Sequence, residues 1–437
     1  MPEKNTKKDD LMMEKIVSLC KRRGFVFQGS EIYGGLGGTF DWGHFGLALK
    51  NNIKQSWWKK FVDGRRDMYG VDAAILMRQE VWQASGHVAG FADPMVECEK
   101  CKEKFRADQV EDKKKCSKCG GKLGEVRQFN MMFTTKVGAS NDSSAMSYLR
   151  PETAQGMFVN FKNTVDAFHP KLPFGMAQIG KAFRNEITPR DFLFRQREFE
   201  QMEIEYYIRQ EDWEKYFEYW KDEMTEWMEE IGLDMGKVHE LEVAASDRAH
   251  YSSRTVDFEF DYPFGRKELF GLAYRTDFDL KNHKLEYIDE EEGKKMIPHV
   301  IEPTFGVDRA VLALIISVYA EDQKEGEIRS YLKFKPNIAP VICAVSPLLK
   351  NKPELVEYAN TKVFAPLKEE FGRIAWDDNG NIGKRYRRQD EIGTPFCIVV
   401  DFDTLSDNSV TVRDRDTGEQ ERVKVAELQK YIKEKIQ

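Results

Sequence analysis

The sequence predicts a multidomain protein of the α+β class, and three observations lead to this prediction. The chain has 437 residues, of which 41% are hydrophobic, enough for two or three domains with cores of their own. Residues 179–207 alternate charged with apolar or aromatic side chains on both sides of a turn sequence, as an antiparallel hairpin does. Beyond residue 337, short apolar strands alternate with helical stretches, which is typical of an α/β domain with a mixed sheet.

Apolar residues at helical spacing predict helices over residues 11–23, 47–62, 211–231 and 306–320. The third of these has a stripe of tryptophan and phenylalanine, which favours packing in a core over binding of a ligand. The glycine-rich segment 33–38 predicts a tight turn, because neither a Walker lysine nor a dinucleotide fingerprint follows it. Residues 285–297 are expected to form a charged connection.

The hairpin at 179–207 concentrates fixed charges of both signs. Its strands are predicted at 179–184 and 198–207, the second with one face in water, and residues 188–191 have turn chemistry. A hairpin of this kind is usually a solvated surface. The apolar neighbours Phe183 and Phe199 favour a partly buried surface instead. On such a surface, one arginine guanidinium can bind two phosphate oxygens at once.

Residues after the linker 334–337 are predicted to form a separate unit. Strands are expected at 341–345, 374–376 and 398–400, with helical stretches at 353–371 and 384–392. Basic runs occur at 384–388 and 413–415, and each run alone is typical of a solvated face.

Four of the seven cysteines lie in a module over residues 95–128 that is rich in Lys and Glu. The pairs Cys98-x-x-Cys101 and Cys116-x-x-Cys119 suit a tetrahedral Zn²⁺ with four thiolates, a structural site of the zinc-ribbon kind. The alternative is four unrelated surface thiols. An odd cysteine count, with most of the thiols in one cluster, is not typical of a secreted disulfide framework.

Charge and hydropathy exclude other classes. The net charge of −7 argues against non-specific coating of nucleic acid, although local basic patches remain possible. No apolar run has the length of a membrane span, and residues 1–10 are charged, unlike a signal peptide. The sequence therefore predicts a cytoplasmic protein that does not contact membranes.

Two segments place charged groups at predicted helix starts. In Arg150-Pro151-Glu152, the proline is expected at the start of a helix, and Glu152 either compensates the helix dipole or binds an ammonium group. Arg309 follows Gly306 and lies in the first turn of the 306–320 helix, where a phosphate is favoured.

These segments resemble a known family. Phe183-Arg184-Asn185-Glu186 with Arg195, and Gly306 with Arg309, resemble motifs 2 and 3 of the class II aminoacyl-tRNA synthetases. Further segments resemble the homodimeric glycyl-tRNA synthetases, and the likeness covers nearly the whole chain. These segments are Tyr33-Gly34-Gly35-Leu36, Ser85-Gly86-His87, Phe91-Ala92-Asp93-Pro94, Arg150-Pro151-Glu152-Thr153-Ala154-Gln155-Gly156, Phe199-Glu200-Gln201-Met202-Glu203 and Gly393-Thr394-Pro395.

The resemblance implies a fold and an activity. Residues 1–335 are expected to hold the class II antiparallel sheet flanked by helices, with the zinc ribbon 95–128 inserted, and residues 337–437 an α/β anticodon-binding domain. The expected reaction joins glycine to the 3′ end of tRNA(Gly) through glycyl-adenylate, with ATP, Mg²⁺ and a structural Zn²⁺, in a homodimer. With tRNA as the ligand, the two basic runs become candidates for backbone contacts, with stacking by Tyr386.

The resemblance also assigns site residues by position. Catalytic charge neutralisation falls to Arg184, Glu186 and Arg309, with Arg184 at the α-phosphate and Arg309 at the γ-phosphate. The expected ATP-binding residues are Arg184, Asn185, Glu186, Phe194, Arg195, Gln196, Phe199, Glu268, Leu269, Gly306 and Arg309. The expected glycine-binding residues are Arg106, Glu152, Glu203, Glu302 and Thr304. Glu268 is also matched to a magnesium ligand.

The sequence departs from the family pattern in three places. Gly43-His44-Phe45-Gly46 replaces Gly-Pro-Leu-Gly, Thr304 stands where many relatives have serine, and Asp308 replaces a glycine. The alternatives are a paralogue without charging activity, a synthetase for another amino acid and a zinc-ribbon nucleic-acid-binding protein. The retained arginines and pocket carboxylates disfavour the first two, and a ribbon explains only a small part of the chain.

Overall fold

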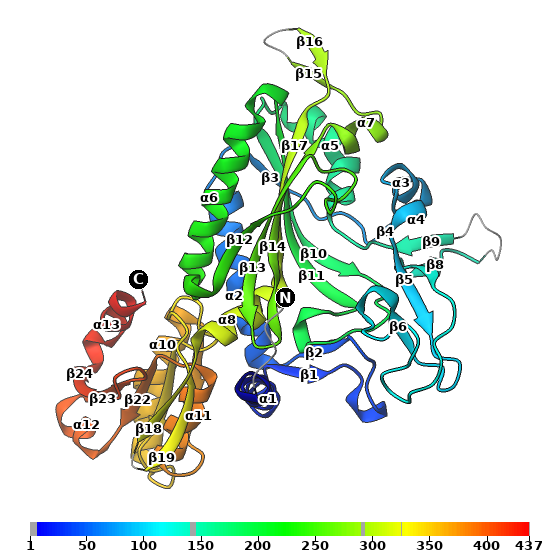
Figure 1. The fold of residues 1–437 in the computed structure, drawn as a ribbon. Helices are drawn as coiled ribbons and strands as arrows, with labels where there is room; N and C mark the ends of the chain where they lie inside the picture. The colour runs from blue at the N-terminus through cyan, green and yellow to red at the C-terminus, as the bar shows by residue number, and fades with distance from the viewer. Residues whose placement is uncertain (1–6, 140–145, 290–292, 325, 437) are drawn as a thin grey trace.

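The structure is a computed structural model that describes residues 7–139, 146–289, 293–324 and 326–436. Residues 1–6, part of the segment judged unlike a signal peptide, and residues 290–292 of the predicted connection lie outside these ranges. The chain folds into a large lobe around a seven-stranded sheet and a smaller C-terminal lobe around a five-stranded sheet (Figure 1). Among the described residues, no helix combines the length and the apolar character that a membrane crossing needs.

The large sheet has the order β12-β13-β14-β17-β11-β10-β3, and its neighbours are antiparallel except β3 and β10. The strands are β3 (Met68–Gly70), β10 (Phe174–Phe183), β11 (Glu198–Ile208), β12 (Val238–Glu242), β13 (Arg254–Tyr262), β14 (Gly265–Thr276) and β17 (His299–Gly306). The antiparallel sheet that the resemblance implies is therefore confirmed, and the predicted hairpin forms its strands β10 and β11.

One face of this sheet packs on helices α2 (His44–Trp58), α6 (Trp213–Ile231) and α8 (Val307–Val318), as Figure 1 shows for α2 and α6. The aromatic stripe predicted to be core is buried there: Trp220 and Trp227 pack around Phe61, and Trp227 also meets Phe305. Each such side chain stabilises the fold by about 1.5–3 kcal/mol through burial.

The other face of the sheet carries the charged side chains, because residues alternate along β11. Met202 and Ile204 join the helix-side core, whereas Glu203 and Glu205 point to the opposite face. The prediction that this face lies in water was wrong: Glu203 is 3% exposed and Glu205 is fully buried. Helix α5 (Ala154–Phe168) covers this face, and its aromatic residues pack on the same strand.

Several predicted boundaries shift. Helix α2 begins at His44, and its last turn is π-helical over Lys59–Asp63. Helix α5 begins at Ala154, after Thr153 at its N-cap, so the expectation that Pro151 opens the helix was wrong. Helix α8 ends at Val318, because Tyr319 begins a strand of the next hairpin.

The N-terminal part consists of α1 (Lys7–Arg22), β1 (Val26–Gln28) and β2 (Phe40–Trp42). The loop between the two strands is the predicted tight turn, with φ values of 91°, 78° and 75° at Gly34, Gly35 and Gly38. A Cβ at Gly38 would lie 2.6 Å from Cβ of Pro189, so this glycine lets the turn approach the hairpin.

The zinc-ribbon segment lies on a small sheet of order β6-β5-β7, made of β5 (Ala92–Glu97), β6 (Lys104–Arg106) and β7 (Arg127–Asn130). Next to it come short elements: β4 (Leu76–Met77), α3 (Gln79–Ala84), α4 (His87–Gly90), β8 (Thr134–Lys136) and β9 (Met146–Leu149).

Helix α7 (Phe278–Asn282) follows β14. The predicted charged connection contains a hairpin, β15 (Tyr287–Asp289) and β16 (Lys294–Met296). A further hairpin, β18 (Tyr319–Lys324) and β19 (Glu327–Leu332), leads to the small lobe.

The small lobe has the predicted mixed sheet, in the order β21-β20-β22-β23-β24. Strands β20 (Cys343–Pro347), β21 (Ile374–Trp376) and β22 (Phe396–Val400) are parallel, and β23 (Ser409–Asp414) and β24 (Gln420–Lys424) are antiparallel. Its helices are α9 (Pro353–Tyr358), α10 (Ala365–Phe371), α11 (Ile382–Ile392), α12 (Phe402–Asp407) and α13 (Leu428–Lys435). Its apolar core is distinct from that of the large lobe.

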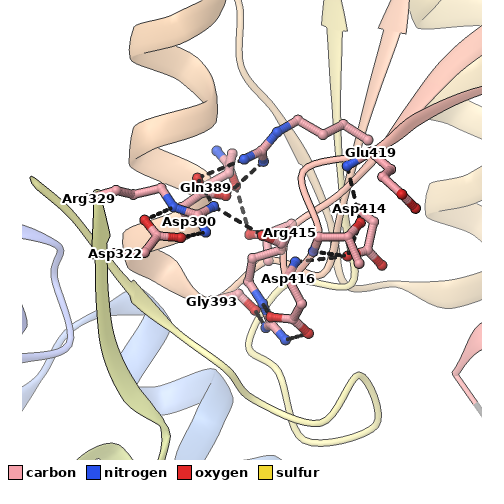
Figure 2. A network of polar contacts seen from close by, with 12 residues as sticks. Asp322, Arg329, Gln389, Asp390, Gly393, Asp414, Arg415, Asp416 and Glu419 are labelled. Atoms are coloured by element: carbon pink, nitrogen blue, oxygen red, sulfur yellow. Dashed lines mark hydrogen bonds and ion pairs between the residues drawn. The ribbon is translucent and has the colours of Figure 1, made fainter. Parts of the chain in front are cut away.

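A buried ion pair and a hydrogen bond to the backbone connect the two lobes, and Figure 2 shows the ion pair. Arg329 of β19 reaches across to Asp390 of α11, with Nη1 3.1 Å from Oδ2, and also pairs with Asp322. Arg413 of the small lobe binds the same Asp390, with Nη1 2.8 Å from Oδ1. Nη2 of Arg415 donates to the carbonyl oxygen of Phe334 at 3.0 Å.

Three arginines of the two basic runs lie inside the protein, not on the nucleic-acid surface that the resemblance suggested. Arg385, Arg413 and Arg415 are 3%, 6% and 3% exposed, and their guanidinium groups bind carbonyl oxygens or carboxylates of the protein. Tyr386 is half-buried, with the guanidinium of Arg413 4.7 Å from its ring centre. The three arginines hold the lobe together, so the expected backbone contacts are a wrong assignment for them. Lys384 and Arg387 are exposed, and for these residues and Tyr386 the expected contacts stay a prediction.

Candidate active site

A cavity of about 440 Å³ opens on the charged face of the large sheet, between strands β11, β14 and β17 and the start of α8. The predicted site residues that line it are Arg106, Glu152, Arg184, Glu186, Phe194, Arg195, Gln196, Phe199, Glu203, Glu268, Leu269, Glu302, Thr304, Gly306 and Arg309. Asn185 is not among the lining residues, and its backbone N–H donates to the carbonyl oxygen of Met131 at 2.7 Å. Residues far apart in the sequence thus meet in one cavity.

One end of the cavity is acidic. Glu152, Glu203 and Glu302 are 8%, 3% and 7% exposed, and the hydroxyl of Thr304 lies between two of them. Its Oγ1 is 3.0 Å from Oε1 of Glu203 and 3.2 Å from Oε1 of Glu302. The threonine that stands where many relatives have serine therefore keeps its hydroxyl between the two carboxylates, where its single O–H can donate to either of them.

The pKa values of two of these carboxyl groups are shifted in opposite directions. Burial raises the pKa of Glu302 to about 8 against the attraction of Arg275, and the charges of Glu203 and Glu152 add to the rise. Burial acts in the same direction on Glu152, but His87, with Nε2 3.2 Å from its carboxylate, outweighs it, and the pKa of Glu152 falls well below its usual value. An acidic pocket with separated pKa values is a typical receptor for a small cation.

The other end of the cavity is basic. The guanidinium of Arg184 lies between the rings of Phe91 and Phe199, 5.4 Å and 5.3 Å from their centres, and its Nε donates to the carbonyl oxygen of Pro151. These contacts hold a planar cation inside the cavity, and among the described residues no carboxylate forms an ion pair with it. An orientation of this kind suits bidentate binding of phosphate oxygens.

Arg309 supplies a second cation from the first turn of α8, as predicted. Its Nη1 lies 3.3 Å from the carboxylate of Glu268, and its guanidinium lies 4.5 Å from the ring centre of Phe194. The charge of Arg309 is the main reason that the pKa of Glu268 is lowered. Arg195 pairs with Glu186 at 3.2 Å on the hairpin rim.

Comparison with known proteins gives the same division of the chain. The model of the tRNA synthetase class II core domain (G, H, P, S and T) matches residues 133–319, and that of the anticodon binding domain matches residues 342–435. The glycine–tRNA ligase of Caldanaerobacter subterraneus is 47% identical over 97% of this chain and 98% of its own length. That of Clostridium acetobutylicum is 48% identical over 98% and 100%, and that of Treponema denticola 47% over 98% and 97%.

The chain belongs to the glycine–tRNA ligase family. It is accordingly a class II aminoacyl-tRNA synthetase with an anticodon-binding domain, and the expected fold and family are confirmed.

Sequence reasoning missed Arg275 of β14, which is 1% exposed beneath the acidic end. Its Nε and Nη2 donate to Asp279 at 2.7 Å and 2.8 Å, and its Nη1 donates to Glu302. The guanidinium also lies 3.7 Å from the ring centre of Tyr251. One signal was available in the sequence: an arginine ends the apolar run 269–274, and a charge in a buried strand needs partners.

Asp257 of β13 was also missed, although it lines the cavity beside Glu268. Burial raises its pKa to about 7, with the charges of Glu268 and Glu259 adding and that of Arg309 opposing. Carboxylate oxygens are the ligands that Mg²⁺ prefers, so Glu268 and Asp257 fit the magnesium that accompanies ATP in this family.

The four cysteines of the ribbon come together as the spacing predicts. Their sulfur atoms all lie within 4.8 Å of one another, with Cys98 and Cys119 3.6 Å apart and Cys101 and Cys116 3.7 Å apart. This donor set fits a tetrahedral Zn²⁺ with four thiolates. The strand that follows the first pair carries Arg106 into the cavity, where it binds Asp93 and Asp108.

Proposed function

We propose that this chain activates glycine with ATP and then transfers the glycyl group to the 3′ end of tRNA(Gly). The observation that carries the proposal is the division of one cavity into an end with three buried carboxylates and an end with Arg184 and Arg309. The names of the relatives support glycine and tRNA as substrates. The same division disfavours a paralogue that lost its substrates, because both ends are intact.

The acidic end is assigned to the ammonium group of glycine. Glu152, Glu203 and Glu302 would surround it, and the hydroxyl of Thr304 lies within hydrogen-bonding distance of Glu203 and Glu302. Glycine has no side chain to bind, so selection has to rest on exclusion of larger amino acids. A rigid pocket can exclude strongly, whereas the contacts of one added methylene group contribute only about 1–3 kcal/mol.

The basic end is assigned to the phosphates. The glycine carboxylate attacks the α-phosphorus of ATP, a new O–P bond forms, and pyrophosphate leaves as its bond to the α-phosphorus breaks. Arg184 would neutralise the α-phosphate and Arg309 the γ-phosphate, without a protein nucleophile. Magnesium held by Glu268 and Asp257 would supply further charge neutralisation at the phosphates.

The second step needs the tRNA inside the same cavity. The terminal ribose hydroxyl attacks the carbonyl carbon of glycyl-adenylate, an ester C–O bond forms, and AMP leaves with the electron pair of the broken C–O bond. The hydroxyl proton is released to solvent. We assign catalysis to residues 1–335, with the zinc ribbon 95–128 as an inserted support, and anticodon binding to residues 337–437. Ile338 and Ala339 pack in the core of the large lobe, so the boundary between the two units lies after residue 339.

The tRNA contacts in the small lobe have to come from side chains other than the buried arginines. Leu349 follows β20 and Phe402 follows β22, at the carboxyl ends of two parallel strands, and both are exposed, at 41% and 46%. Ligands of α/β sheets bind at these ends, and single-stranded bases stack on apolar rings.

A homodimer is part of the proposal. The loop between β1 and β2 and the start of α2 expose large apolar side chains close together in the sequence: Phe27, Ile32, Tyr33, Leu36 and Leu47. Ile32 and Tyr33 are both 87% exposed, which is unusual for such side chains unless a partner covers them. We further propose that the protein works in the cytoplasm.

The test is ATP–pyrophosphate exchange with the full-length protein across a panel of the protein amino acids. We expect exchange with glycine and little with alanine or serine, followed by charging of tRNA(Gly) when tRNA is added. Exchange with another amino acid but not with glycine would overturn the assignment. Light scattering on the same sample tests the dimer.

A further inference from the structure

Glu205 lies beneath the acidic end of the cavity and is the carboxyl group that the proposed mechanism does not use. It is fully buried, and no hydrogen-bond donor among the described residues reaches either of its oxygen atoms. It stands two residues after Glu203 on β11, so both side chains lie on the same face of the sheet.

The strand register places Glu205 beside Glu302. Glu203 is opposite Thr304 and Tyr206 is opposite Ile301, so Glu205 faces Glu302 across β11 and β17. Directly opposed residues of antiparallel strands have Cβ atoms about 4.5–5.5 Å apart. The two carboxyl groups are therefore near neighbours: Glu302 lines the cavity, whereas Glu205 behind it is fully buried and has no contact with water.

The charged and titratable groups around Glu205 leave it without a counter-charge. Arg275 is the cation that faces it, and the nitrogen atoms of this guanidinium are engaged by Asp279 and Glu302. The remaining neighbours are Glu203 and Tyr207 of its own strand, Glu302 of β17 and Asp279 of α7. A buried, ionised carboxylate without a partner is strongly unfavourable, so the neutral acid is the stable form.

We propose that Glu205 is a positioning residue of the glycine pocket: it remains a neutral carboxylic acid, and its O–H donates to Glu302. This hydrogen bond holds the Glu302 carboxylate between Glu205, Arg275 and Thr304 and aims it at the ammonium group. The inference rests on the proposed assignment of Glu302 to glycine binding. Burial and the surrounding carboxylates, Glu302 first among them, raise the pKa of Glu205 well above its usual value, which agrees with this role.

Two variants of the full-length protein test the inference. Glu205→Gln is neutral and keeps an N–H donor, so we expect its KM for glycine to stay within about twofold of the unchanged protein. Glu205→Leu is neutral without a donor, and we expect its KM for glycine to rise about tenfold while KM for ATP and the thermal midpoint hold. An equal loss in both variants, or no loss in the leucine variant, would overturn the proposal.

A spectroscopic measurement tests the protonation state without relying on activity. In a difference spectrum between the unchanged protein and Glu205→Gln, recorded at pH 9.5, above the pKa values of Glu302 and Asp257, the variant should lose one carboxylic-acid C=O stretch. An unchanged spectrum would show that Glu205 is ionised and would overturn the proposal.

Glu302→Gln separates this inference from the proposed function. If Glu302→Gln leaves KM for glycine unchanged, the assignment of the pocket itself is wrong. If Glu302→Gln raises KM for glycine and Glu205→Leu does not, the assignment of the pocket to glycine is kept and the proposed role of Glu205 is wrong.

Discussion

Nζ of Lys50 lies 3.1 Å from Oδ1 of Asp308, the residue that precedes Arg309. The second oxygen of Asp308 accepts the backbone N–H of Glu200 at 2.7 Å, and Lys50 also pairs with the carboxylate of Glu200. Asp308, which replaces a glycine of the family pattern, thus joins α2, β11 and α8 behind the proposed γ-phosphate site.

Replacing Lys50 by methionine should weaken both stability and nucleotide binding. Two buried carboxylates, Asp308 and Glu200, would lose their shared cation, and removal of one partner from a buried pair costs roughly 3–5 kcal/mol. We expect a lower thermal midpoint and a higher KM for ATP in glycine-dependent exchange. Lys54→Met is the matched control, because Lys54 also binds Glu200 but lies in a more exposed position. Equal effects of the two variants would contradict this account.

Replacing Arg184 by alanine should nearly abolish glycine-dependent exchange, because the cation proposed to neutralise the α-phosphate would be lost. A lost charge-assisted contact in the transition state typically reduces kcat by about 10²–10³-fold. Arg190→Ala is the control, since Arg190 belongs to the same hairpin but is nearly half exposed and pairs with Asp191. Full exchange by the Arg184 variant would refute the phosphate assignment.

Glycine and protons should compete for the acidic pocket. The pKa of Glu302 is about 8 in the folded protein instead of 4.5, so its proton stabilises the empty pocket fully below pH 4.5. This contribution is lost as the pH rises through about 8. We therefore expect KM for glycine to fall about tenfold between pH 6.5 and 8.5, and the thermal shift caused by glycine to grow. The Glu302→Gln variant should show neither trend; a flat profile in the unchanged protein would count against the assignment.

Loss of zinc should impair the active site, because it displaces Arg106. The strand that carries this arginine follows Cys101 directly, and Arg106 holds Asp93 beside the cavity. We expect Cys116→Ser to lose bound zinc, measured by elemental analysis, and to raise KM for glycine or ATP while the small lobe keeps its thermal transition. Lys114→Ala, in the same module, should retain both metal and activity. A zinc-free variant with unchanged kinetics would show that the ribbon does not support the cavity.

The sequence predicted features that local periodicity carries. The aromatic stripe of 211–231, the hairpin strands and the cysteine pairs all depend on spacing within one segment, and the structure has each of them. The family motifs likewise marked the residues that line the cavity. The burial of Glu203 and Glu205 escaped prediction, because the helix that covers this face comes from residues 154–168 and no local pattern records the contact.

Charges were the hardest features to interpret. Arg385, Arg413 and Arg415 form basic runs in the sequence, but their partners, such as Asp390 and the carbonyl oxygen of Gly393, lie in other segments. Arg275 went unnoticed for the same reason, since Asp279 and Glu302 meet it only in the fold. A run of like charges indicates where cations are, and only tertiary structure indicates which of them are already neutralised.

The ion pairs between the lobes have a consequence for how the enzyme measures its substrate. Arg329 forms an ion pair with Asp390, and Arg22 of α1 forms one with the neighbouring Glu391 at 2.8 Å. Two separate parts of the large lobe therefore contact the same helix, α11. Two contacts of this kind restrict hinge motion between the two lobes at this helix. We therefore expect the small lobe to keep a fixed distance from the cavity, so that a tRNA bound to both has to span this distance between its 3′ end and its anticodon.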